Sequence, residues 1–169
     1  MKRGIPHGRA ATQSGAGLIE VMISVLILGI GLLGIAAMQA TALKNSQSSL
    51  QRSQAVAQTY SILDSMRANR AAALSGDYNQ SSMQCKAPAG GSLAQEDLHE
   101  WISAIKAGFG KPTDDETACG QVSCDNAGLC TVIVQWDDSR ATAVAGGDGE
   151  QAANHEGGTK RQVTTAVQL

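Results

Sequence analysis

The stretch that decides the fold is QSGAGLIEVMISVLILGIGLLG, residues Gln13–Gly34, in which a single carboxylate, Glu20, lies at the edge of an uncharged apolar run. Eighteen residues from Val21 to Met38 carry no charge, and Ser24 is the only polar one. This length is sufficient for a membrane-spanning helix. A cleaved secretory signal is the competing interpretation, but its apolar region is usually about 7 to 15 residues and ends at a small-residue cleavage site. Here the run passes directly into a helical pattern at Gln39, which favours a membrane anchor.

Charge is distributed unevenly around this run. The first fifteen residues carry Lys2, Arg3 and Arg9 and no acid, which leaves 10 bases and 15 acids in the remainder, a net charge of -5. The positive-inside rule keeps the basic end in the cytoplasm, so everything after Met38 is expected outside the inner membrane. An acidic body without clustered Lys and Arg argues against nucleic-acid binding.

Glu20 needs an explanation because a carboxylate deep in hydrocarbon costs roughly 2.5 to 3.5 kcal/mol on insertion scales. The nearest bases, Arg9 and Lys44, lie eleven and twenty-four residues away. A cut between Gly15 and Ala16 would create a positive α-amine four residues from Glu20, either in its own chain or in a neighbouring subunit. The alternative is that Glu20 reaches the headgroup region at the end of the helix. Spacing alone leaves both interpretations open.

The string SG followed by AGLIEV, residues 14–21, and an uninterrupted apolar helix resembles the class III leader and cleavage site of type IV prepilins. The resemblance implies that prepilin peptidase cuts after Gly15, removes residues 1–15 and methylates the new amine of Ala16. It also implies that Glu20 neutralises the amine of a neighbouring subunit during assembly. The family usually has Phe or Met after the cut, whereas this chain has Ala.

Three glycines interrupt the apolar run, at Gly29, Gly31 and Gly34. Each weakens a helix by about 1 kcal/mol relative to Ala, although glycine is tolerated where membrane helices pack closely. Helix packing is therefore one interpretation. The prepilin resemblance implies another, in which this part of the helix unwinds locally in the assembled pilus; no Pro occurs nearby, so such melting would depend on the glycines alone.

After Met38 the apolar residues recur at helical spacing. The residues expected to form this stripe are Leu43, Leu50, Val56, Tyr60, Leu63 and Met66. A stop signal follows at Ser75-Gly76-Asp77. The pattern predicts one continuous helix from Ala16 to about Leu74, with its C-terminal half packed on a head domain through the stripe.

Two segments of the head resemble PilV-type minor pilins: MRANRAAALSGDY, residues 66–78, and LAQEDLHEW, residues 93–101. In that family the first segment closes the long helix and the second forms a helix beside the sheet. Arg67 and Arg70 have a simpler interpretation as solvated cations at a helix C-terminus, and Asn69 as a residue that bonds nearby backbone. Trp101 is expected to anchor the core.

The rest of the head predicts a short helix and a small antiparallel sheet. Ser92 with Gln95 forms a capping-box signature, and apolar residues then recur on one face as far as Gly108. Residues 131–136 and 161–169 alternate as strands, and residues 121–124 form a weaker strand joined to the first by a turn at 125–128. The expected fold is therefore α+β, with a long N-terminal helix on a small antiparallel sheet, a second short helix and a disulfide-stabilised C-terminal head. The resemblance implies that this fold is type IV pilin-like.

Four cysteines, Cys85, Cys119, Cys124 and Cys130, all follow the apolar helix. An even number in an oxidising compartment predicts two disulfides, for which three pairings exist. The favoured pairing joins Cys124 to Cys130 across a hairpin and Cys85 to Cys119. A zinc site is the rival, but no C-x-x-C pair is present.

No constellation for catalysis, metal or cofactor binding emerges from the remaining residues. The three histidines, His7, His99 and His155, are scattered, and the acids at 114–116 and 137–138 are expected to be exposed loop acids rather than a calcium site. Residues 137–160 predict a long loop rich in Gly, Ala and acids, which is either a partner-binding segment or plain flexible chain. We therefore expect that the protein is not an enzyme and holds no cofactor.

Together the resemblance implies a minor pilin divided into a cleaved leader (1–15), a transmembrane and filament-core half-helix (16–38), an amphipathic half-helix (39–74) and a periplasmic head (75–169). The expected partners are prepilin peptidase, the inner-membrane assembly machinery, other minor pilins, the major pilin and a tip adhesin. The expected role is to initiate type IV pilus assembly, which supports adhesion and twitching motility. A pseudopilin of a type II secretion system and an unprocessed single-pass periplasmic binding domain are the alternatives.

Overall fold

The computed structural model describes residues 17–139 and 160–169, so the predictions for Gly15, Ala16 and most of the 137–160 loop lie outside the described residues. In chain order the elements are α1 (Leu18–Ala68), α2 (Arg70–Ser75), α3 (Leu93–Gly108), β1 (Cys119–Cys124), β2 (Leu129–Asp137) and β3 (Lys160–Gln168). By their contacts the residues form two compact units, one ending at Thr41 and the other from Ala42 to Leu169. The second unit is called the head below. The α+β composition expected from the sequence is confirmed.

The long helix ends earlier than predicted. α1 covers 51 residues and stops at Ala68, and the short α2 begins at Arg70, so the expected continuous helix as far as Leu74 is wrong at its last turns. Asn69 separates the two helices with φ -114° and ψ 50°, outside the helical region, and its side-chain amide donates to the hydroxyl of Tyr78. α2 then ends at Gly76, whose φ of 89° is a left-handed conformation that glycine adopts without steric cost.

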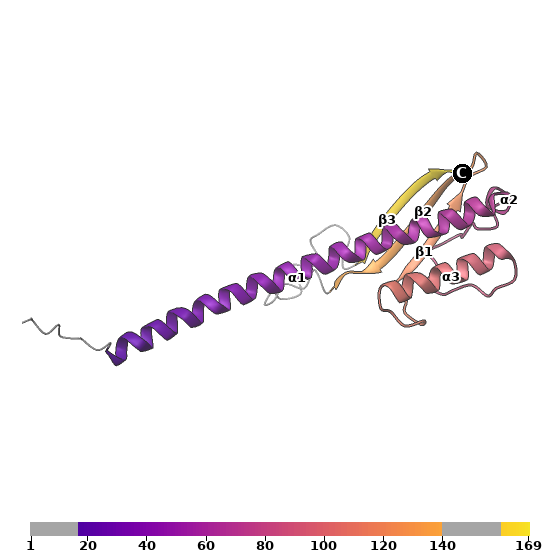
Figure 1. The fold of residues 1–169 in the computed structure, drawn as a ribbon. Helices are drawn as coiled ribbons and strands as arrows, with labels where there is room; N and C mark the ends of the chain where they lie inside the picture. The colour runs from indigo at the N-terminus through magenta and orange to yellow at the C-terminus, as the bar shows by residue number, and fades with distance from the viewer. Residues whose placement is uncertain (1–16, 140–159) are drawn as a thin grey trace, which may run out of the picture. The chain divides into compact units, whose positions relative to one another are not determined.

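The head has one core between its helices and one face of a three-stranded sheet (Figure 1). The strands are hydrogen-bonded in the order β1-β2-β3 and both pairs are antiparallel. In β2 alternate residues are buried, among them Val132, Val134 and Trp136, as the alternation in the sequence predicts. Burial of one face of β2 fixes the strand register, because a slip by one residue would expose this whole set.

The buried face of α1 differs from the predicted stripe. Leu63 and Met66 are buried as expected, and Val56 is half-buried. Tyr60, however, is 53% exposed, and the fully buried position beside it is Thr59. Successive helical residues point about 100° apart, so only one of these two neighbours can face the sheet. Small side chains at Thr59 and Ala55 occupy this contact, which a search for large apolar residues passes over.

Two further members of the predicted stripe are exposed. Leu43 is 63% and Leu50 is 59% exposed, although both lie on α1 within the head unit. The buried residues of α1 instead begin at Ala55 and end at Met66. The helix therefore packs on the core over a shorter length than its apolar pattern indicates.

Helix α3 begins and ends as predicted. Ser92 accepts a hydrogen bond from the Gln95 backbone while the Gln95 side chain accepts one from the Ser92 backbone, which is a complete capping box. Trp101 is buried and its indole N–H donates to the backbone oxygen of Gln58 on α1, 2.9 Å away. Gly120 on β1 permits this packing, since a β-carbon there would lie 2.5 Å from the Trp101 ring.

Candidate functional site

The most distinctive surface of the described chain is the first part of α1, from Leu18 to Met38, which we call the apolar segment. Its large apolar side chains are all exposed. The most hydropathic 18-residue window of α1 has a mean hydropathy of 2.6, and none of it is buried within the structure. By length and composition this segment can cross a membrane.

Glu20 lies in the first turn of α1. Its backbone N–H donates to the oxygen of Gly17 at 2.9 Å, and its own carbonyl accepts a hydrogen bond from the Ser24 hydroxyl at 2.7 Å. Its side chain is exposed, and no ion pair joins it to any residue within 17–139 or 160–169. An acid near a helix N-terminus is favoured by the helix dipole. The position leaves the carboxylate available to a cation from outside these residues.

Gly29, Gly31 and Gly34 all lie within continuous α-helix. A β-carbon built at any of them would meet nothing within 4 Å. No side chain of the described structure therefore requires glycine at these positions. Both interpretations offered by the sequence, close packing with another helix and local unwinding, involve a state in which α1 has neighbours from other molecules.

In the head, polar side chains meet around Tyr78. Its ring is buried, its hydroxyl donates to Oδ2 of Asp97 on α3, and it accepts a hydrogen bond from the Asn69 amide at 3.3 Å. Burial, followed by the hydrogen bond to Asp97, raises the pKa of Tyr78 from 10.0 to about 12. The cluster joins the break between α1 and α2 to α3. Asn69 thus has a tertiary role where the sequence predicted a contact with nearby backbone.

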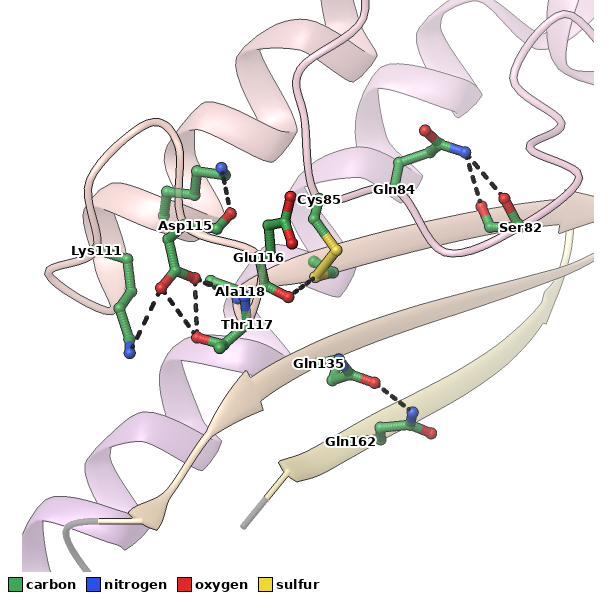
Figure 2. Close-up of a disulfide and its surroundings, with 12 residues drawn as sticks. Ser82, Gln84, Cys85, Lys111, Asp115, Glu116, Thr117, Ala118, Gln135 and Gln162 are labelled. Atoms are coloured by element: carbon green, nitrogen blue, oxygen red, sulfur yellow. Dashed lines mark hydrogen bonds and ion pairs between the residues drawn. A yellow bond between two sulfur atoms is a disulfide. The ribbon is translucent and has the colours of Figure 1, made fainter. Parts of the chain in front are cut away.

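A second polar cluster organises the loop between α3 and β1 (Figure 2). The Asp115 carboxylate accepts hydrogen bonds of 2.8 Å from the backbone N–H groups of Thr117 and Ala118 and from the Thr117 hydroxyl. Burial works to raise the pKa of Asp115, but these hydrogen bonds and the Lys111 charge outweigh it and lower the pKa below 3.8. Asp115 is therefore a structural acid, whereas the sequence predicted an exposed one.

A buried lysine also binds the backbone of this loop. Lys106 is 3% exposed, and its ammonium group donates to the backbone oxygens of Thr113 and Asp115, the latter at 2.7 Å. Lys111 lies 3.7 Å from the Asp115 carboxylate and 3.8 Å from that of Asp137. The two lysines hold the turn against the end of α3 and the end of β2.

Asp138 is also buried, which corrects the prediction of an exposed loop acid. Only 4% of it is exposed, and its Oδ2 accepts a 2.7 Å hydrogen bond from the Ser48 hydroxyl of α1. Arg161 at the start of β3 lies 3.9 Å from the same oxygen. Burial of this carboxylate is offset by a hydrogen-bond donor and a nearby cation. It ties the ends of β2 and β3 to α1.

The cysteines pair as Cys85–Cys119 and Cys124–Cys130, the pairing that the sequence analysis favoured, and all four are bonded. The hairpin register places Cys124 directly opposite Cys130. Figure 2 shows the other disulfide at Cys85, where it joins the segment after α2 to the sheet. Both bonds are confined to the head.

The structure also gives partners within the head to three residues named in the sequence analysis, Arg67, Arg70 and His99. Arg67 pairs with Asp64 at 2.8 Å on the exposed surface. Arg70 donates to the backbone oxygen of Leu169 at 3.0 Å, and the His99 ring lies 2.7 Å from the backbone oxygen of Pro88. Among the described residues, no group of three or more His, Cys, Asp or Glu side chains is arranged to hold a metal ion.

Comparisons of the chain with protein-family models, with curated proteins and with solved structures gave no match. The geometry of the apolar segment and of the head is therefore the basis for the functional argument.

Proposed function

We propose that this chain is a type IV pilus minor pilin of the PilV type, made as a prepilin and anchored in the bacterial inner membrane by the apolar segment. The proposal rests mainly on helix α1, whose two ends have different surroundings. Its first part is exposed and carries one acid, Glu20, and the buried residues between Ala55 and Met66 form part of the core of a disulfide-bonded head. A subunit that moves from a bilayer into a filament needs this combination.

In the proposed pathway, prepilin peptidase removes residues 1–15 on the cytoplasmic side and methylates the amine of Ala16. Glu20 then pairs with the amine of a neighbouring subunit as the helix leaves the membrane. The exposed carboxylate in the first turn of α1 supports this step, because a charged group in a low-dielectric filament core requires a partner. The boundaries at residues 15 and 38 belong to the same proposal.

The head faces the periplasm and joins a complex of other minor pilins, the major pilin and a tip adhesin. In this complex the protein helps to start pilus assembly, with adhesion and twitching motility as the cellular results. Its two disulfides support an oxidising location for the head. The protein acts through binding, and we propose no catalytic step for it.

The test compares Glu20→Ala with Glu96→Ala, which removes an acid from the first turn of another helix, α3. Both variants should insert into the membrane and fold. We expect Glu20→Ala to remain in the membrane and to be lost from sheared pili, whereas Glu96→Ala should enter pili like the unaltered chain. Equal incorporation of both variants would refute the proposed charge pairing.

A deletion strain distinguishes a minor pilin from a pseudopilin of type II secretion, which would share the leader and the helix. We expect loss of surface pili with normal enzyme secretion. The reverse result, normal pili with failed secretion, would assign the chain to the secretion system.

A further inference from the structure

The outer edge of β1 is closed by the chain itself. Residues 79–85, which we call the edge segment, follow α2 and bind along this strand. Gln84 exchanges backbone hydrogen bonds with Gly120 at 2.8 and 2.9 Å, and the Gln80 backbone N–H donates to the oxygen of Val122 at 2.9 Å. The edge segment therefore takes the place of a neighbouring strand at two positions of β1.

Two side-chain amides of the edge segment complete this closure. The Asn79 side chain accepts a hydrogen bond from the backbone N–H of Cys124 at 2.7 Å and donates one to its backbone oxygen at 3.1 Å. The Gln80 side chain accepts from the backbone N–H of Val122 at 3.0 Å. These amides bond to backbone groups of β1 that a paired strand would otherwise satisfy.

β1 thus has two sets of backbone N–H groups. Those of Gly120, Val122 and Cys124 donate to the edge segment. Alternate residues of an antiparallel strand point their N–H groups to opposite sides, so those of Gln121 and Ser123 point towards β2, with which they pair. The first set reports on the edge segment, and the second reports on the sheet.

The edge segment contributes no buried side chain. Asn79, Ser81 and Ser82 are exposed, and the other four residues are half-buried. Its neighbours on both sides are better anchored, because Tyr78 is fully buried and Ala87 packs against the core. Segments with few buried apolar contacts and accessible backbone hydrogen bonds are those that open locally while the rest of a protein stays folded.

A covalent bond opposes such opening here. The Cys85–Cys119 disulfide joins the end of the edge segment to β1. Cys119 is fully buried, whereas Cys85 is half-buried, so we expect a reductant to attack on the Cys85 side. The Cys119 sulfur lies 3.4 Å from the backbone oxygen of Glu116 (Figure 2), which gives a released thiol a hydrogen-bond acceptor.

The other disulfide has a different position. Cys124 and Cys130 lie directly opposite each other in the ladder between β1 and β2. This ladder pairs the two strands over the whole of β1, so it holds them together whether or not the disulfide is formed. Reduction of Cys124–Cys130 is therefore expected to release no segment.

We propose that the Cys85–Cys119 disulfide is a redox switch for the β1 edge. In the oxidised chain the edge segment stays on β1. After reduction by a dithiol it opens locally, while β1 stays paired with β2. The uncovered edge is then available to another strand in the reduced chain only.

The reduction is an ordinary thiol–disulfide exchange. One thiolate of the dithiol attacks the Cys85 sulfur, and Cys119 leaves as a thiolate that takes up a proton. The second thiol of the reductant then displaces Cys85, which is protonated in turn. The products are two cysteine thiols and the disulfide of the reductant.

The test is hydrogen exchange at single-residue resolution on the full chain in detergent. The variant Cys124→Ser/Cys130→Ser retains only the Cys85–Cys119 disulfide, so dithiothreitol acts on that bond alone. We expect reduction to speed exchange at Gly120 and Val122 by at least about tenfold, with little change at Gln121 and Ser123.

The matched control is Cys85→Ser/Cys119→Ser, which retains only the hairpin disulfide. Its exchange at Gly120 and Val122 should already be fast compared with the unaltered oxidised chain, and dithiothreitol should not change it. Slow exchange at Gln121 and Ser123 verifies that the sheet is folded. This comparison with the unaltered chain also decides the question if the first variant does not fold.

Two results would overturn the inference. Equal acceleration at all four positions would show that the disulfide holds the whole strand rather than the edge segment. Slow exchange at Gly120 and Val122 after reduction would show that hydrogen bonds alone keep the edge closed. Neither result depends on leader cleavage, so the proposed function and this inference can fail separately.

Discussion

The hydroxyl of Tyr78 donates a hydrogen bond to the carboxylate of Asp97, and this contact fastens the chain that follows α2 to helix α3. The same hydroxyl accepts from Asn69 at the point where α1 ends. The hydroxyl of Tyr78 thus contacts both the residue that follows α1 and a residue of α3.

Tyr78→Phe should destabilise the head by about 1 to 3 kcal/mol, because it leaves the Asp97 carboxylate and the Asn69 amide without this partner. Tyr60→Phe is the matched control, since Tyr60 is exposed and its change should have an effect close to zero. Thermal unfolding followed by circular dichroism measures both. Equal melting temperatures for the two variants would contradict the role given to Tyr78.

The raised pKa of Tyr78 predicts a pH dependence at the alkaline end. The folded chain holds the phenol proton up to about pH 12, whereas the unfolded chain releases it near 10.0. Stability from this group is therefore complete below pH 10.0 and is lost as the pH rises towards 12. In Tyr60→Phe, tyrosinate absorbance should rise with a midpoint near 12. A midpoint near 10 would show that Tyr78 is not buried.

Asp115→Asn should loosen the loop between α3 and β1. The carboxylate accepts several hydrogen bonds there, and their weakening should cost about 1 to 3 kcal/mol. The pKa of Asp115 is lower in the folded chain than in the unfolded one. Its contribution to stability is therefore present above the unfolded pKa and is lost as the pH falls through the folded pKa. Asp114→Asn, at an exposed neighbour, is the control. A cost as large in the control would mean that the effect is not specific to Asp115.

The two disulfides should contribute unequally. Cys85–Cys119 closes a loop with a sequence separation of 34, and Cys124–Cys130 one of 6. Loop-closure entropy gives about 4 kcal/mol for the first and about 2 kcal/mol for the second. Paired Cys→Ser variants, unfolded in denaturant, test this order. If loss of the hairpin disulfide costs more, chain entropy is not the main source of their stabilisation.

Short patterns in the sequence predicted several features of the head correctly. The capping box at Ser92 and Gln95 placed the start of α3, and the alternation of Val132, Val134 and Trp136 placed the buried face of β2. The hairpin turn also placed Cys124 opposite Cys130. In each case the sequence signal lies within a few residues.

Features that depend on distant partners were missed. α1 ends at Ala68, where neither Gly nor Pro marks the break, and the next residue, Asn69, donates to the hydroxyl of Tyr78. Asp138 is buried because Ser48, ninety residues earlier, supplies a donor. Thr59 takes the core position that the pattern assigned to Tyr60, since the sheet approaches closely at a small side chain. The size of the side chain, rather than its hydropathy, therefore decided that Thr59 and not Tyr60 is buried.

The most direct test of the proposed function is the intact mass of the chain purified from bacterial membranes, read together with its N-terminal fragment. A processed prepilin begins at Ala16 and carries one added methyl group on its amine, which supplies the cation proposed for Glu20. We predict this mass, and we predict that it disappears in a strain without prepilin peptidase. A chain that still begins at Met1 in the peptidase-containing strain would contradict the account.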